Sequence, residues 1–175
     1  MSADKSMSIS REITVRQHVT ASLPPAPEAE RFAGIAIGEH GGAVVVIGCD
    51  LALVEVAPIE RAWPHFASAV LKILRAHRPS HVTVAGSREA ASVAIRVGRL
   101  EGLAMASCGV MAGALTLREI CARLQSASPT ADENWDAIQL AKGLFPGFLA
   151  PQPSVDSLTY AAALLAAASA RLTAY

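Results

Sequence analysis

The stretch from residue 61 to residue 99 gathers positive charge that could contact a polyanion. Seven basic residues and one acid lie in it: Arg61, Lys72, Arg75, Arg78, Arg88, Arg96 and Arg99, with Glu89. On a helix, Arg88, Arg96 and Arg99 fall within about a quarter-turn of one another, opposite an apolar stripe. With Lys72 and Arg75 they are our candidates for binding DNA phosphates. The alternative is a solvated face that balances acids elsewhere, because the chain carries 15 basic and 15 acidic residues.

Cysteine spacing and the glycine-rich turn carry no recognisable motif for metal binding or covalent catalysis. The three cysteines, Cys49, Cys108 and Cys121, are an odd number, widely spaced, with no Cys-x-x-Cys pair. We interpret them as buried reduced thiols of a cytoplasmic protein. The turn at 38–42 lacks the Gly-Lys-Ser/Thr ending of a phosphate loop. No serine sits in a Gly-x-Ser-x-Gly elbow.

Length and composition predict one domain with an apolar patch on its surface. The chain has 175 residues, 52% of them hydrophobic, and its 17% of charged residues is below the usual ~25%. Few charges keep such a surface apart from others, so we expect a patch that meets a protein partner or a second copy. Zero net charge gives no global attraction to nucleic acid or to a membrane. The apolar run at 157–170 is shorter than the ~20 residues that span a bilayer, and predicts a buried helix.

The chain divides into a leader and a domain. Residues 1–30 are polar, lack sustained periodicity and end in the proline-rich Leu23–Pro27, which predicts a flexible leader. Within the leader, Ile13–Arg16 alternates as an edge strand would. Residues 31–175 carry continuous apolar patterning and are interpreted as one domain.

The first part of the domain predicts an antiparallel meander. Phe32–Ile37 and Ala43–Gly48 are short apolar runs on either side of a glycine-rich turn, and Leu51–Val56 follows as a third strand. Connections this short leave no room for a crossover helix, so neighbouring strands must be antiparallel.

Helices and strands alternate after the meander, which implies parallel crossovers. The helices are expected where apolar residues recur with the helical period, and Pro79 ends the first of them. In order, the expected elements are a helix at 60–77, a strand at 81–85, a helix at 88–105, a strand at 110–114, and helices at 117–124, 132–144 and 155–172. The sequence therefore predicts an α/β fold with a five-stranded mixed sheet and helices on both faces.

Three segments, in this order, resemble the RuvC family of Holliday-junction resolvases. Phe32–Gly38 (FAGIAIG) is similar to that family's first strand, Ala94–Ala104 (AIRVGRLEGLA) to its central helix, and Pro151–Ala161 (PQPSVDSLTYA) to its last helix. The likeness spans residues 31–172. It implies a ribonuclease-H-like fold and, for the family, junction cleavage assisted by divalent metal ions.

The same resemblance implies a site that has lost most of its ligands. The family uses four acids, because two divalent cations must clamp the scissile phosphate through oxygen ligands. Here the first-strand acid corresponds to Ala36, and the fourth-strand acid falls within Thr83–Ala85. In the last helix Asp156 remains, but its partner position holds Thr159. Asp156 alone would bind Mg²⁺ weakly at most, so we expect no catalytic residue, no metal site and no cofactor.

Further departures from the family concern DNA contacts and replacement acids. Where the family has a basic residue, this chain has the acidic stretch Asp132–Asp136, and the family's aromatic wedge falls at Gly86–Ser87. Glu39, Asp50 and Glu89 are acids that a rearranged site could recruit. Glu39 lies in a turn and Glu89 in a helix, at positions where the family has no ligand.

These patterns favour a non-catalytic relative, a pseudo-resolvase, that binds branched or duplex DNA or a protein partner as a cytoplasmic homodimer. One alternative is a metal-dependent junction endonuclease with a rearranged site around Asp156. A second is a protein-only scaffold subunit of a larger complex. A third is a likeness of fold alone, such as sugar kinases and actin share with this sheet.

Overall fold

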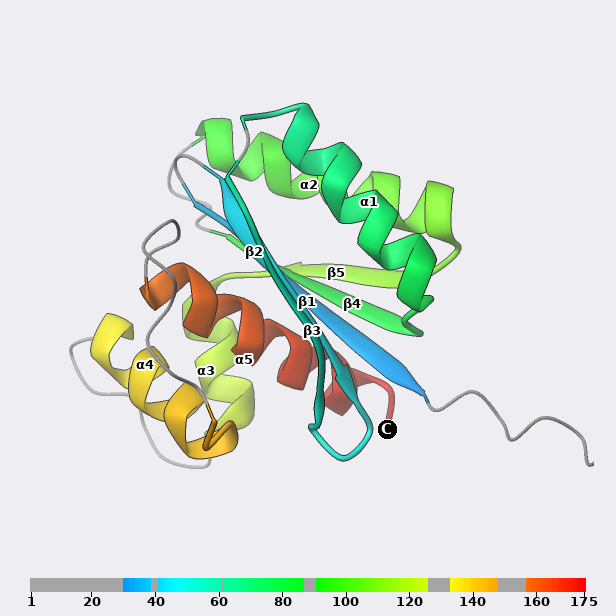
Figure 1. Ribbon diagram of the computed structural model, residues 1–175. Helices are drawn as coiled ribbons and strands as arrows, with labels where there is room; N and C mark the ends of the chain where they lie inside the picture. The colour runs from blue at the N-terminus through cyan, green and yellow to red at the C-terminus, as the bar shows by residue number, and fades with distance from the viewer. Residues whose placement is uncertain (1–29, 39–40, 61, 87–90, 126–132, 148–156) are drawn as a thin grey trace, which may run out of the picture.

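Five strands form one mixed sheet at the centre of the molecule (Figure 1). The computed structural model describes residues 30–38, 41–60, 62–86, 91–125, 133–147 and 157–175. The strands are β1 (Arg31–Ile37), β2 (Gly42–Gly48), β3 (Leu53–Ile59), β4 (His81–Ala85) and β5 (Met111–Leu115). Their order across the sheet is β3-β2-β1-β4-β5; β1, β2 and β3 pair antiparallel, and β1, β4 and β5 pair parallel. The predicted meander and parallel units are confirmed.

Helices cover both faces of the sheet, as the sequence predicts (Figure 1). The helices are α1 (His65–His77), α2 (Ala91–Cys108), α3 (Leu117–Leu124), α4 (Glu133–Leu144) and α5 (Ser157–Thr173). The first two lie together on one face, and the last three lie on the other. Alternate residues of each strand therefore enter two separate cores. In β1, Ala33 and Ile35 face α1 and α2, whereas Phe32 and Ala36 face α5.

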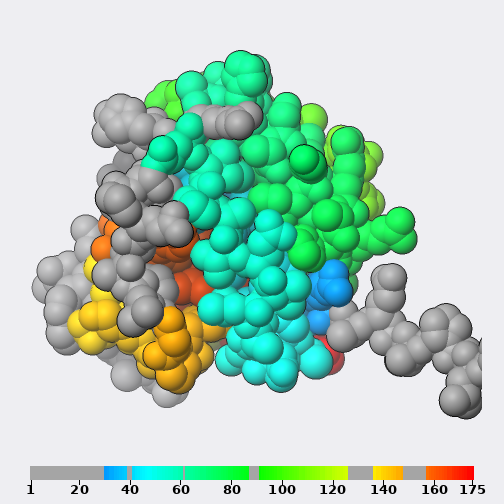
Figure 2. Space-filling view, viewed as in Figure 1, coloured from blue at the N-terminus to red at the C-terminus, as the bar shows by residue number. Residues whose placement is uncertain are grey.

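The closing helix α5 packs directly on the central strand β1. Residues 159–170 of α5 are buried, and Figure 2 shows only small areas of this helix, in orange and red, between α4 and the β2–β3 hairpin. At Gly34, an added Cβ would lie 2.0 Å from Ala163 O and 2.2 Å from Ala167 N. The alanine-rich sequence of α5 and the glycine of β1 together allow this backbone-to-backbone approach.

A polar cluster joins β1, β3 and α1. The guanidinium of Arg31 lies 3.3 Å from His77 Nδ1, and His77 Nε2 pairs with Glu55 Oε2. A guanidinium can only donate, so Nδ1 accepts and Nε2 carries the proton toward Glu55. The cluster connects the end of α1 to the sheet.

Several element boundaries differ from the predicted ones, each for a local reason. The strand expected at 51–56 is β3 at 53–59, because a turn occupies 49–52 and Leu51 adopts a positive φ of 65°. The helix expected from 60 begins at His65, after Pro64, because proline disfavours helical backbone in the residue before it. In α2, Val97, Leu100 and Ala104 are buried on one side of the helix, and Val93 on the same side is partly buried.

The prediction of three buried thiols is wrong for one of them. Cys121 is buried and Cys108 is partly buried, whereas Cys49 is exposed in the β2–β3 turn. Cys49 lies in the short connection between the second and third predicted strands, and the turn formed there brings it to the surface. Residues 1–29 of the predicted leader, which include its edge strand, lie outside the residues that the structure describes.

Candidate functional site

The two lost strand acids of the resemblance correspond to neighbours in the sheet. Ala36, near the carboxyl end of β1, is the register partner of Ala85, the last residue of β4. Both side chains face α5, and they are 2% and 3% exposed. Parallel pairing places the carboxyl ends of β1 and β4 at the same edge of the sheet. The register thus selects Ala85, within the predicted range 83–85, as the residue beside Ala36.

Thr159 closes the same region from α5. It is 9% exposed in the first turn of the helix, and a Cβ added at Gly38 would lie 3.2 Å from its Oγ1. The next residue, Tyr160, belongs to the same apolar cluster as the two alanines, and burial raises the pKa of its phenol. Three of the positions singled out in the sequence are therefore brought together, in an apolar environment.

The described residues at this site do not fit a pair of divalent cations. Ala36 and Ala85 offer methyl groups, and Thr159 offers one neutral hydroxyl, whereas Mg²⁺ needs several charged or carbonyl oxygens. Within the described ranges, no three His, Cys, Asp or Glu side chains come close enough to hold a metal ion. Asp156, the remaining acid of the resemblance, lies outside these ranges.

The acids considered as replacements do not complete the site. Asp50 is exposed in the β2–β3 turn, where its Oδ1 accepts a hydrogen bond of 3.0 Å from Ala52 N. This turn follows the end of β2, which pairs with the start of β1. Asp50 and Ala36 therefore lie at opposite ends of the strands. Glu39 and Glu89 lie outside the described residues.

Four of the five basic candidates lie on the α1–α2 face of the sheet. Lys72 and Arg75 are exposed on α1, Arg99 is exposed on α2, and Arg96 is half-buried beside it. The two helices contact each other. None of the four makes an ion pair with the part of the chain that the structure describes. The fifth candidate, Arg88, lies outside it.

The outer side of α2 carries the apolar surface that the composition predicts. The residues of this outer row are Ala91, Ile95, Gly98, Gly102 and Met105, and all are exposed. Ile95 is 54% exposed and Met105 48%. A Cβ added at either glycine of the row would meet nothing within 4 Å. A helix that is apolar on its outer side as well as its inner side normally has a partner.

The sheet order, the mixed pairing and the two helical layers define a ribonuclease-H-like fold. Among solved structures, RuvC from Thermus thermophilus matches this chain with a TM-score of 0.61, covering 82% of this chain and 96% of that one. The two sequences are 22% identical, so the likeness establishes a RuvC-like fold. Neither the protein-family models nor the curated proteins gave a match by sequence.

In the described parts of the chain, no helix combines the length and the apolar character needed to cross a bilayer.

Proposed function

We propose that this chain is a RuvC-like domain that acts by binding and does not cut nucleic acid. The observation that carries the proposal is the pair Ala36 and Ala85, side by side and buried against α5 where the family resemblance calls for acids. Two-metal phosphate cleavage needs carboxylates at such positions. A site filled by packed methyl groups offers neither the ligands nor the open space.

Branched or duplex DNA is the ligand that we propose. The support is the group formed by Lys72, Arg75, Arg96 and Arg99, which lie on two adjacent helices and make no ion pairs with the described residues. Unpaired cations on one face can displace the counterions of a phosphate backbone. A protein partner in place of DNA is the alternative reading of the same face.

We further propose that two copies associate through the outer row of α2. In the row, Ile95 and Met105 stand on either side of the two glycines, so an antiparallel pair of α2 helices would place Ile95 of each copy against the flat glycine region of the other. Such an arrangement is self-complementary, as an isologous two-fold interface must be. Zero net charge means that two copies do not repel each other as a whole.

A two-fold pair of this kind would extend the basic surface. In an antiparallel helix pair related by a two-fold axis, each flank of one helix lies beside the same flank of the other. Arg96 and Arg99 share one flank of the outer row, since they are three residues apart. The arginines of both copies would then form one continuous basic strip, although neither monomer has a net positive charge.

The location that we propose is the cytoplasm. The structure shows no disulfide among the described residues, and proteins of reducing compartments keep their cysteines in the thiol form.

One gel experiment tests the binding proposal. Purified protein is mixed with a labelled four-way junction and with the matching duplex, in Mg²⁺ and separately in EDTA, and is analysed on native and denaturing gels. We expect a shifted junction with intact strands in both buffers. The double variant Arg96→Gln/Arg99→Gln should weaken the shift at least about tenfold. The matched control Arg123→Gln/Lys142→Gln removes two charges on the other helical layer and should leave the shift unchanged.

Two other outcomes distinguish the alternatives. Strand cleavage in Mg²⁺ that EDTA removes and Asp156→Asn abolishes would establish a metal-dependent endonuclease with a rearranged site. An unshifted junction, together with stable capture of one specific protein, would establish a scaffold subunit. The first outcome contradicts the proposed lack of cleavage, and the second contradicts the proposed binding of DNA.

A further inference from the structure

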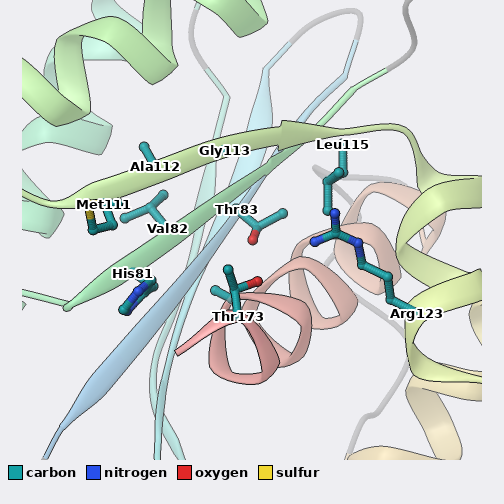
Figure 3. Close-up of a pocket in the computed structure, with 10 residues that line it drawn as sticks. His81, Val82, Thr83, Met111, Ala112, Gly113, Leu115, Arg123 and Thr173 are labelled. Carbon is teal, nitrogen blue, oxygen red and sulfur yellow. The ribbon is translucent and has the colours of Figure 1, made fainter. Parts of the chain in front are cut away.

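A pocket of about 320 Å³ lies on the α5 side of the sheet (Figure 3). Its floor is formed by β4 and β5, and its walls come from α3 and α5. It includes His81 and Met111, the first residues of their strands. Ala85, at the far end of β4, does not line the pocket, although its register partner Leu115 does, so the pocket adjoins the site described above but does not share its residues.

The polar side of the pocket is suited to an anion. The side chains of Thr83, Arg123 and Thr173 point toward one another (Figure 3). Thr83 is 4% exposed, and neither its hydroxyl nor the guanidinium of Arg123 has a partner among the described residues. Among the described residues, no aspartate or glutamate lines the pocket. A nearly buried hydroxyl and an unpaired cation directed at one space are the groups that bind carboxylates and phosphates.

Gly113 keeps the apolar part of the pocket open. Gly113 is the register partner of Thr83, so both face the same side of the sheet. A Cβ built on Gly113 would meet nothing within 4 Å. Met111 and Leu115 flank it along β5, and Ala170 covers it from α5. Because Gly113 has no side chain, apolar space remains beside the polar groups.

We propose that this pocket binds a small amphipathic organic anion. Its carboxylate or phosphate contacts Arg123 and the Thr83 hydroxyl, and its aliphatic body lies over Gly113 between Met111 and Leu115. At the ~30 Å³ that a water molecule takes in the liquid, 320 Å³ holds about ten non-hydrogen atoms. Mostly apolar walls with a few convergent polar groups are the usual composition of a ligand site.

The charge preference follows from comparing two electrostatic sources beside the pocket. The carboxyl end of α5 is near Thr173 and contributes a partial negative charge of about one half. The guanidinium of Arg123 contributes a full positive charge and also donates hydrogen bonds in a fixed plane. The cation outweighs the helix end, so an anion is favoured over an alcohol or an amine of the same shape.

Calorimetric titration of the full chain with octanoate tests this inference, with 1-octanol and octylamine as probes of equal length. We expect saturable binding of octanoate, at least about tenfold tighter than either control. Arg123→Gln should weaken octanoate binding about tenfold and remove the preference over 1-octanol. Arg75→Gln, which removes an arginine from the opposite helical layer, should have no effect.

Gly113→Val is the sharpest variant because it fills the pocket and suits a strand. It should fold as well as the parent protein and should no longer bind octanoate, whereas Gly102→Ala on α2 should bind normally. If Gly113→Val failed to fold, Thr83→Val would remove the buried hydroxyl at constant shape and should weaken binding. Equal binding of octanoate and 1-octanol, or full binding by Arg123→Gln and Thr83→Val, would overturn the inference. The result is independent of the junction experiment, which concerns the opposite helical layer.

Discussion

At the scale of single residues, the methyl groups of Ala36 and Ala85 determine what the carboxyl ends of β1 and β4 can do. Ala36→Asp would place a carboxyl in a position that is 2% exposed. Burial raises the pKa of such a group above its unfolded value, so the loss of stability grows as pH rises above about 4 and the unfolded state ionises. We expect a loss of about 3 kcal/mol in the free energy of unfolding at pH 8, and less at pH 5.

Urea unfolding of Ala36→Asp, with and without Mg²⁺, provides the measurement. Ala36→Asn is the uncharged control of similar size, and its loss of stability should not depend on pH. We expect Mg²⁺ to restore nothing, because Ala85 and Thr159 do not supply further carboxylates. Recovery of stability in Mg²⁺ would instead show that a metal site persists around Asp156.

A second residue-scale prediction concerns the hydroxyl of Ser169. This side chain is 0% exposed in α5, and its Oγ has no hydrogen-bond partner among the described residues. Ser169→Ala removes an unsatisfied polar atom and improves helix propensity, so we expect about 1 kcal/mol of added stability. Thermal and urea unfolding would measure it. Ser107→Ala, at an exposed position of α2, reports the propensity contribution alone and should gain less; equal gains would mean that the Ser169 hydroxyl is satisfied.

At the scale of elements, the contact between β1 and α5 limits what the central strand accepts. Gly34→Ala would place a methyl group 2.0 Å from the backbone oxygen of Ala163. Backbone atoms cannot turn aside as a flexible side chain can, so α5 must move away from the sheet. We expect about 3 kcal/mol of lost stability in urea unfolding. Gly102→Ala, where a Cβ meets nothing within 4 Å, should gain about 1 kcal/mol by helix propensity. A loss below about 1 kcal/mol for Gly34→Ala would contradict this packing.

The order and type of the elements could be predicted from the sequence because they follow from local patterns. Apolar runs fixed the strands, and the helical period placed the helix at 117–124 at its observed bounds. The start of β3 depended instead on the positive φ of Leu51, which no pattern signals. At the start of α3, Thr116 Oγ1 accepts a hydrogen bond of 3.2 Å from Glu119 N in a capping box. The spacing of Thr116 and Glu119 is a sequence signal for the first residue of this helix.

The candidate site was predictable only as far as the family resemblance reached. The resemblance identified Ala36 and Thr159, but only the strand register shows which residue of β4 lies beside Ala36. The pocket at Thr83 and Arg123 joins residues 40 positions apart through the tertiary fold, and no spacing in the sequence signals such a contact. Long-range packing therefore accounts for what sequence patterns missed.

At the scale of the whole molecule, the two helical layers have different proposed roles. The α1–α2 layer carries basic residues that make no ion pair within the described part of the chain, and it carries the apolar outer row of α2, which suits large partners. The α5 layer is tightly packed and holds the small pocket. Because the sheet separates the layers, substitutions in one should leave the binding properties of the other unchanged.

The proposed dimer predicts an unusual dependence on ionic strength. An antiparallel α2 pair brings Arg96 and Arg99 of both copies onto one flank, where they repel each other. Salt screens this repulsion, since the Debye length falls from about 30 Å at 0.01 M to about 8 Å at 0.15 M. We therefore expect the dimer to tighten as salt is raised, or when a short DNA duplex is added, in sedimentation equilibrium. Arg96→Gln/Arg99→Gln should form a tight dimer at all salt concentrations.

The apolar part of the same interface is tested by Ile95→Glu. A charge at this position of the outer row should raise the dimer dissociation constant by at least about tenfold, because burying an aliphatic side chain contributes about 1.5–3 kcal/mol. Leu172→Glu is the matched control, since Leu172 is 50% exposed on the other helical layer. A dimer that weakens with salt, or that survives Ile95→Glu, would show that the copies associate through another surface. The basic residues of α1 and α2 would then have to bind DNA as a monomeric patch, and their junction affinity would not depend on protein association.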